Sequence, residues 1–191
     1  MDLGQEKELV ERARKDSQAF GELYEHHYSP IFAYILRRTA SIEISQDICS
    51  EVFFKAFRNL GQFRWRDVPF SSWLYRIANN EIANHYRNNR QQHSSFEKVA
   101  NSASFIDTTP ESELIEAETE LKQHEDFLKL HANISKLSMK YQEVITLRYF
   151  KGKQLKEIAE ILRKREGTVK SLLHRGLEKL RELMEQDATF Q

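Results

Sequence analysis

Apolar residues recur at three- and four-residue steps along most of the chain, and the two-residue alternation typical of strands is almost absent. This pattern predicts an all-α protein. Residues 5–15 should form one short helix, and Asp16 can cap a second. Pro30 is expected to kink or restart that second helix. Its apolar side contains Phe20, Leu23, Tyr24, Tyr28, Ile31, Phe32, Ile35 and Leu36.

The pattern predicts a third helix after Ser45, a candidate N-cap, with Gly61 ending it. A loop containing Pro69 follows over residues 62–71, and a fourth helix should span residues 72–89. The buried stripe of the third helix is expected to be Ile48, Cys49, Val52, Phe53, Ala56, Phe57 and Leu60. In the fourth helix the residues with the spacing of a core are Trp73, Leu74, Ile77 and Ala78.

Helical periodicity disappears between Gln91 and Thr109, where Ser, Asn, Gln and Thr dominate. Residues 111–130 regain helical character but are acidic. We therefore expect two small helical domains, residues 1–92 and 131–191. A flexible linker over residues 93–130, with a helical end, should join them.

The last sixty residues contain two short amphipathic segments separated by the basic turn Arg163–Arg165, which predicts a helix-turn-helix. A helix that begins after Ser138 and stops at Gly152 precedes it. In the last helix the core-facing residues should be Val169, Leu172, Leu173, Leu177 and Leu180. The opposite face carries hydrogen-bond donors, which is what reading the major groove requires. A solvated helix with ordinary surface charge is the alternative, and the paired helix before it favours DNA binding.

Two sets of motifs resemble one family. EIAEIL at residues 157–162 and GTVKS at 167–171 resemble the promoter-reading domain of sigma factors, over residues 137–183. DICSEVFFKAF at residues 47–57 and FSSWLYRIANN at 70–80 are similar to the two signature runs of the N-terminal sigma domain. The chain therefore resembles an extracytoplasmic-function (ECF, group IV) sigma factor of the sigma-70 family along nearly its full length.

The resemblance implies that the third helix docks on the clamp helices of core RNA polymerase. Asp47, Glu51 and Phe54 fall on its outer face, and an acidic face with one exposed aromatic suits protein docking. Ser50 stands where the family usually has Gln. Asp47 taken alone could equally support the helix N-terminus through the helix dipole.

The resemblance also implies two DNA-reading surfaces. In the loop, Arg64, Trp65 and Arg66 interleave cations with an aromatic, as in proteins that hold single-stranded DNA, and would catch a base flipped out of the −10 element. Phe63 is expected in the core, whereas Trp65 fits either role. The fourth helix contributes a polar stripe for the −10 strand, comprising Arg76, Asn80, Asn84 and Arg87. The residues expected on the double-stranded −35 element are Arg165, Thr168, Lys170, Ser171, His174 and Arg175.

Besides Ser50, four positions depart from the family, and one of them is Glu81, where an apolar residue is usual. Asn84 replaces a usual Asp and would weaken a salt bridge with Arg87. Arg163 stands where Gly is common, so we expect a mildly strained backbone there. Gln154, in place of a capping Ser, should weaken the start of the first helix of the pair.

Charge is distributed unevenly, although the formal net charge is zero. Residues 131–191 hold 13 Lys/Arg against 8 Asp/Glu, and residues 96–130 hold 3 against 9. The single Cys49 excludes an intramolecular disulfide and is expected to be a buried thiol in a reducing cytoplasm. No apolar run approaches the roughly 20 residues of a membrane span, and no signal-peptide core is present. No metal-ligand or cofactor pattern is apparent.

Three functions can be compared. A sigma factor, without catalysis of its own, accounts for every motif. A stand-alone helix-turn-helix regulator leaves residues 47–57 and 63–84 without a role. An enzyme is disfavoured because the sequence has no Gly-rich phosphate loop, nucleophile elbow or metal cluster. The implied partners are core RNA polymerase and promoter DNA, double-stranded at −35 and single-stranded at −10. The resemblance alone adds a membrane-anchored anti-sigma factor.

Overall fold

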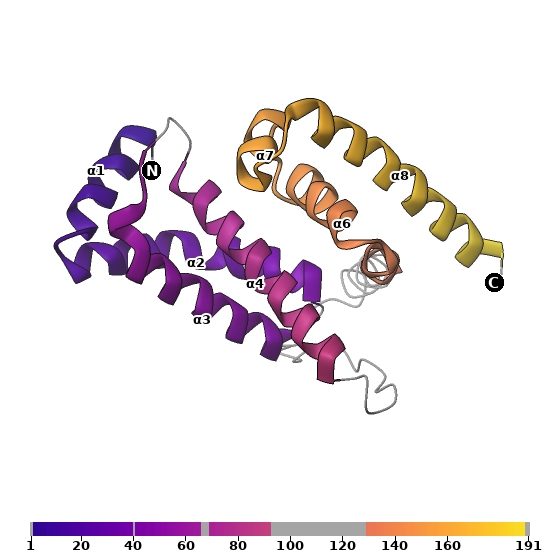
Figure 1. Cartoon of the computed structure of the whole chain (residues 1–191), viewed down its shortest axis with the longest axis horizontal. Helices are drawn as coiled ribbons and strands as arrows, with labels where there is room; N and C mark the ends of the chain where they lie inside the picture. The colour runs from indigo at the N-terminus through magenta and orange to yellow at the C-terminus, as the bar shows by residue number, and fades with distance from the viewer. Residues whose placement is uncertain (1, 40, 66–68, 93–128, 190–191) are drawn as a thin grey trace, which may run out of the picture.

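The computed structural model describes residues 2–39, 41–65, 69–92 and 129–189. These ranges consist of helices and short connections and contain no strand, which confirms the all-α prediction. Figure 1 shows an N-terminal helical body, α1–α4, beside a C-terminal body that contains α6–α8. The predicted linker lies outside the described residues as far as residue 128, and residues 129–136 are helical.

The N-terminal body is built around α2 (Ser17–Thr39), which packs against α1 (Leu3–Ala13), α3 (Ile42–Asn59) and α4 (Phe70–Gln92). A short 3-10 turn, η1 (Leu60–Gln62), follows α3. The Asp16 carboxylate accepts a hydrogen bond from the backbone N–H of Gln18 at 2.9 Å, which confirms the predicted cap of α2. The fully buried core side chains of this body include Leu23, Ile31, Ile35, Val52, Phe70, Leu74 and Ile82.

Helix α2 continues through Pro30, so of the two predicted outcomes the restart is wrong, and the kink stays a prediction. Proline removes one backbone hydrogen bond and crowds the preceding turn, which disfavours a helix interior. The side chains just beyond it, Ile31, Tyr34 and Ile35, are completely buried. Their packing holds the helix together, because tertiary burial of an apolar face contributes more to helix stability than local propensity does.

Two predictions for α3 are also wrong. The helix starts one turn earlier than expected, because Ser41 and not Ser45 caps it by accepting from the N–H of Ile44 at 3.3 Å. Ser45 is buried inside the helix, and its hydroxyl lies 2.7 Å from that of Thr39. Phe57 is 48% exposed. It lies at the margin of the apolar stripe, where its ring packs edge to face with that of Phe20 at a centroid distance of 4.9 Å.

The C-terminal body contains α6 (Met139–Ile145), η2 (Thr146–Phe150), α7 (Leu155–Leu162) and α8 (Glu166–Thr189). Ser138 occupies the N-cap position of α6, as predicted. Gly152 has a φ of 61°, a left-handed conformation that reverses the chain after η2 and that glycine adopts without strain. Helices α6 and α8 approach closely at Gly176, because a Cβ there would lie 3.2 Å from both Tyr141 and Ile145.

The two bodies touch along α4 and α7 and along α2 and η2. The Arg37 guanidinium lies 5.1 Å from the centre of the Phe150 ring, and the Lys153 ammonium lies 5.8 Å from that of Tyr75. Both are distances at which a cation is attracted to an aromatic face. Burial, reinforced by the charge of Arg37, lowers the pKa of Lys151 to about 8. The contact is therefore rich in cations from both sides.

Candidate protein and nucleic-acid interfaces

The outer face of α3 presents the predicted docking residues together. Asp47, Ser50 and Phe54 are exposed, and Glu51 is half-buried. Glu51 pairs with Lys55 at 3.1 Å, and Lys55 also reaches Glu81 on α4 at 2.6 Å. The Phe54 phenyl ring is 53% exposed and suits contact with an apolar group of a partner protein. The Arg58 guanidinium covers one side of Phe54, 5.6 Å from the ring centre.

The predicted polar stripe of α4 is only partly accessible. Asn80 and Arg87 are exposed, whereas Arg76 and Asn84 are half-buried. The Asn84 side-chain oxygen accepts a hydrogen bond from Arg87 at 2.9 Å. An amide thus replaces the carboxylate that the family usually has, and a neutral acceptor gives a weaker bond than a charged one.

The segment before α4 combines a buried and an exposed side chain. Phe63 is buried, which confirms its expected place in the core, and Arg64 is exposed. Trp65 is half-buried, and its ring lies edge-on to Phe63 at 6.2 Å. Arg66 lies outside the described residues. Arg64 and Trp65 are therefore the described members of the predicted single-strand site.

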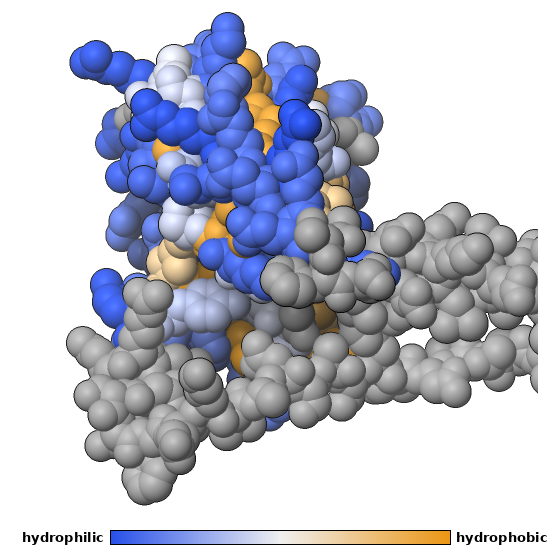
Figure 2. Space-filling model, turned by 90° about the vertical axis from the view of Figure 1, so that its right-hand side faces the viewer, coloured by the Kyte–Doolittle hydropathy of each residue, from blue (hydrophilic) through white to orange (hydrophobic). Residues whose placement is uncertain are grey.

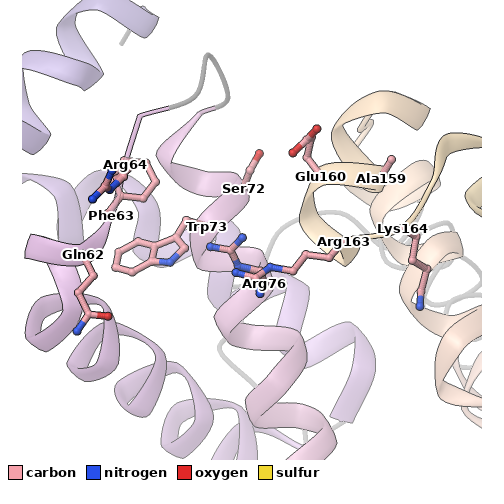
Figure 3. A pocket seen from close by; sticks show the side chains of 10 residues that line it. All are labelled: Gln62, Phe63, Arg64, Ser72, Trp73, Arg76, Ala159, Glu160, Arg163 and Lys164. Atoms are coloured by element: carbon pink, nitrogen blue, oxygen red, sulfur yellow. The ribbon is translucent and has the colours of Figure 1, made fainter.

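A cleft of about 550 Å³ lies between the two bodies, where α4 faces α7 and the turn after it (Figure 3). Arg64 and Arg76 line it from the N-terminal body, and Arg163 and Lys164 line it from the C-terminal one. Figure 3 shows the Arg163 side chain reaching toward Arg76. Glu160 is the single carboxylate among the lining residues. Cations from both bodies thus converge beside the predicted −10 stripe, an arrangement suited to a polyanion.

Arg163 adopts a left-handed conformation with a φ of 52°, as its position in the turn predicts. This conformation is uncommon for a residue with a β-carbon and costs of order 1 kcal/mol. The N-terminus of α7 is capped despite Gln154, because the Glu157 carboxylate accepts a hydrogen bond from the Gln154 N–H at 2.8 Å. The expected weakening at Gln154 is therefore compensated by Glu157.

The predicted major-groove face of α8 is exposed along its whole length. Its exposed members are Arg165, Thr168, Lys170, Ser171, His174 and Arg175. On the opposite side Val169 and Leu180 are buried, so α8 has one exposed and one buried face, as predicted. The Ser171 hydroxyl donates to the Gly167 carbonyl at 3.0 Å, and His174 Nδ1 lies 3.3 Å from Glu178. The part of the surface that is coloured in Figure 2 is mostly hydrophilic, with hydrophobic atoms in narrow strips.

Two family patterns match the chain: Sigma-70 region 2 over residues 23–92, and Sigma-70, region 4 over residues 127–180. The ECF RNA polymerase sigma factor SigW of Bacillus subtilis is 30% identical, over 95% of this chain and 97% of that protein. The chain belongs to the ECF sigma factors of the sigma-70 family. BldN of Streptomyces coelicolor, also an ECF RNA polymerase sigma factor, is 30% identical over 95% of this chain, which spans 66% of the length of BldN.

Among solved structures, that of the sigma factor RpoE in complex with the anti-sigma factor NepR from Bartonella quintana is similar, with a TM-score of 0.66. It covers 87% of this chain and 96% of its own at 19% identity, which establishes likeness of fold. As an ECF sigma factor, the protein directs core RNA polymerase to promoters and initiates transcription. Its region 2 contains the outer face of α3 and the stripe of α4, and its region 4 contains the helix-turn-helix.

Region 2 of this sigma factor also contains a buried polar cluster that the sequence pattern did not indicate. The Asn79 side-chain oxygen accepts from the Tyr34 hydroxyl and from the Arg38 guanidinium, both at 2.6 Å. All three side chains are buried. Asn79 precedes the exposed Asn80 on α4, so this cluster fixes the rotation of the helix that presents Asn80. Helical spacing placed Asn80 on the outward stripe, but it did not indicate that Asn79 would bond to Tyr34 and Arg38.

The contact between the two regions of the sigma factor was likewise absent from the sequence prediction. Amphipathic periodicity identifies the buried face of each helix but not the partner that covers a polar face.

In the part of the chain that the structure describes, no group of three or more His, Cys, Asp or Glu side chains could hold a metal ion. No helix among the described residues has a stretch apolar and long enough to span a bilayer.

Proposed function

We propose that this sigma factor divides its work among three surfaces. The outer face of α3, with Asp47, Ser50, Glu51 and Phe54, binds core polymerase. The segment with Arg64, Trp65 and Arg66, together with the α4 stripe Arg76, Asn80, Asn84 and Arg87, captures the melted −10 strand. The exposed face of α8 and the turn before it, with Arg165, Thr168, Lys170, Ser171, His174 and Arg175, binds the −35 duplex.

One observation carries the division: the six predicted −35 residues are exposed on one side of the helix-turn-helix, while the opposite side of α8 is buried. A recognition helix needs this arrangement, because base edges in the major groove are read by side chains that project from one face. Arg76 of the α4 stripe instead lines a cleft with aromatic rings and cations, the combination that holds unpaired bases and phosphates. Duplex and single-strand reading thus have chemically different surfaces.

The proposal includes domain limits of residues 1–92 and 131–191, with residues 93–130 between them. It assigns the protein no catalysis of its own, since each surface binds and positions. It also places the protein in the cytoplasm, where a bacterial polymerase subunit meets the chromosome. An anti-sigma factor is a further proposed partner, supported by the similarity to RpoE, whose structure contains NepR. Whether such a partner is membrane-anchored is a separate part of the proposal, and its support is the family resemblance.

Run-off transcription with purified core polymerase tests the proposal. Promoter fragments would first be selected from genomic DNA with the reconstituted holoenzyme. We expect transcripts from these fragments with core and the full-length chain together, and none with either alone. A stand-alone regulator would bind the same duplexes without core and would give no transcript. The absence of transcripts, with core polymerase active on another sigma factor, would contradict the proposal.

A further inference from the structure

Helix α1 is hydrogen-bonded to both ends of the segment that connects η1 to α4. The Arg14 guanidinium, at the C-terminal end of α1, donates a hydrogen bond to the Phe63 carbonyl at 2.5 Å. Near the other end of α1, the Glu6 carboxylate accepts from the backbone N–H of Phe70, the first residue of α4, at 3.0 Å. The match to region 2 begins at residue 23, so α1 lies outside it.

The contact made by Glu6 is buried and charged. Glu6 is only 6% exposed, and its second oxygen lies 3.2 Å from Nε2 of His27 on α2. Burial raises the pKa of Glu6, but the contact with His27 and the Phe70 N–H outweigh it, so the pKa lies below its usual value. Helix α4 has no acidic residue in its own first turn. Glu6 therefore places a negative charge at the N-terminus of α4, where the helix dipole favours it.

Phe70, whose N–H binds Glu6, also connects this hydrogen bond to the proposed single-strand site. Its ring is fully buried and lies 5.4 Å from the Phe63 ring and 5.5 Å from that of Trp73. Phe63 in turn packs against Trp65. Phe63 and Trp73 line the same cleft as Arg64 and Arg76 (Figure 3). A displacement of the first residue of α4 would therefore move the aromatic rings that support this site.

We infer that Glu6 and Arg14 are positioning residues for −10 opening. Arg14 is hydrogen-bonded to the Phe63 carbonyl and Glu6 to the Phe70 N–H. Together these bonds fix Phe63–Trp65 relative to the first turn of α4. A site that must hold a flipped base gains from such support, because unstacking a base is unfavourable and the pocket has to be formed in advance. The inference rests on the proposed role of Arg64, Trp65 and Asn80 in opening the −10 element.

The test compares Glu6→Ala, Glu6→Gln and Arg14→Ala in holoenzyme on a duplex promoter. Glu6→Gln keeps an oxygen that can accept from the Phe70 N–H, whereas Glu6→Ala leaves that donor buried without its acceptor. Glu8→Ala and Glu8→Gln are matched controls, because Glu8 is an exposed carboxylate on the same helix. The readouts are the rate of strand opening, transcription from a template already melted at −10, affinity for core polymerase, and thermal stability.

We expect Glu6→Ala to slow strand opening roughly ten- to a hundredfold, the range for a hydrogen bond to a charged group. Glu6→Gln should restore part of this rate, and both Glu8 variants should match wild type. Core affinity and transcription from the melted template should stay near wild type in every variant. Arg14→Ala, whose side chain is partly exposed, should slow opening in the same selective way and provides the test if Glu6→Ala does not fold.

Wild-type opening by folded Glu6→Ala and Arg14→Ala would overturn the inference. Equal loss of opening, core binding and melted-template transcription would also overturn it, because that is the signature of a merely structural role. If wild-type holoenzyme itself opened no promoter, the proposed function would fail instead. The two failures are therefore distinguishable.

Discussion

Asn80 and Arg175 represent two chemically different ways in which side chains read a promoter. Arg175 projects from the exposed face of α8, where a guanidinium can reach a base edge in the major groove. Asn80 is exposed and, with Arg163 and Lys164, lines a second pocket between α4 and the turn after α7. Its amide offers a donor and an acceptor to the edge of an unpaired base. Single substitutions should therefore separate the two activities.

We expect Arg175→Ala to weaken binding to a −35 duplex by about 1–3 kcal/mol, most visibly at altered −35 sequences, without blocking transcription from a pre-melted template. A pure phosphate contact would instead weaken binding to all sequences alike. Lys179→Ala, an exposed cation on the same helix, is the matched control. Duplex binding by titration measures the effect, and equal binding by Arg175→Ala and wild type would refute the assignment.

Asn80→Ala should show the reverse behaviour. Binding to the −35 duplex should stay at the wild-type level, while strand opening on a duplex promoter slows because a contact to the unpaired base is lost. Gln18→Ala, a truncated amide on the exposed side of α2, serves as the control. Loss of −35 binding in parallel with opening, with the fold intact, would defeat the division of labour between the two regions.

Cys49 should react very slowly with thiol reagents in the native protein. The side chain is completely buried, and burial raises its pKa to about 12. The thiolate is the reactive form, and a thiol with a pKa of about 12 is almost entirely protonated at neutral pH. The rate of disulfide exchange with an aromatic disulfide, measured with and without denaturant, checks this. Fast reaction of the folded protein would contradict the buried position.

At the scale of single elements, the outer face of α3 should act as a unit in polymerase binding. Asp47→Lys and Glu51→Lys should each weaken binding of core polymerase while leaving the domain folded, because both side chains point away from the apolar stripe. Lys55 would keep its partner Glu81 in either variant. Glu25→Lys, an exposed charge reversal on α2, is the control. Unchanged core affinity in both α3 variants would show that the docking assignment is wrong.

Helix periodicity predicted the helices themselves more accurately than their ends. The core face of α8 and the N-caps at Asp16 and Ser138 were predictable, because capping residues and apolar spacing are local properties. Continuation of α2 through Pro30 was not, since burial of the next turn decides it. The start of α3 was misplaced because Ser41 and Ser45 are equally good caps by local criteria, and only packing buries Ser45.

At the scale of the whole molecule, the two regions contact one another in a way that promoter binding must change. The cleft brings Arg163 of the helix-turn-helix beside Arg76 on α4. In duplex DNA the −10 and −35 elements are about 25 base pairs apart, or roughly 85 Å at ~3.4 Å per pair. Because α4 and α7 are in contact, we expect the two surfaces to move apart before both reach their elements. Side-chain chemistry locates each surface from sequence, but the contact between them depends on tertiary packing that periodicity does not report.

We expect the two regions to separate when the holoenzyme binds a promoter. Fluorophores attached at Gln62→Cys and Glu166→Cys, both exposed positions on opposite sides of the contact, would report the distance between them. The buried thiol of Cys49 should remain unlabelled. Energy transfer should be high in the free protein and should fall on promoter binding. Equally high transfer in a transcriptionally active complex would contradict the separation.

Promoter opening by the polymerase-bound protein tests the account most directly. Permanganate oxidises thymines that are unpaired, so it reports strand separation at single positions. On a linear duplex carrying a selected promoter, we predict reactive thymines in the −10 element with core polymerase and this protein together, and none with either alone. The account would be contradicted if the protein bound both core and the −35 duplex but left every −10 thymine unreactive.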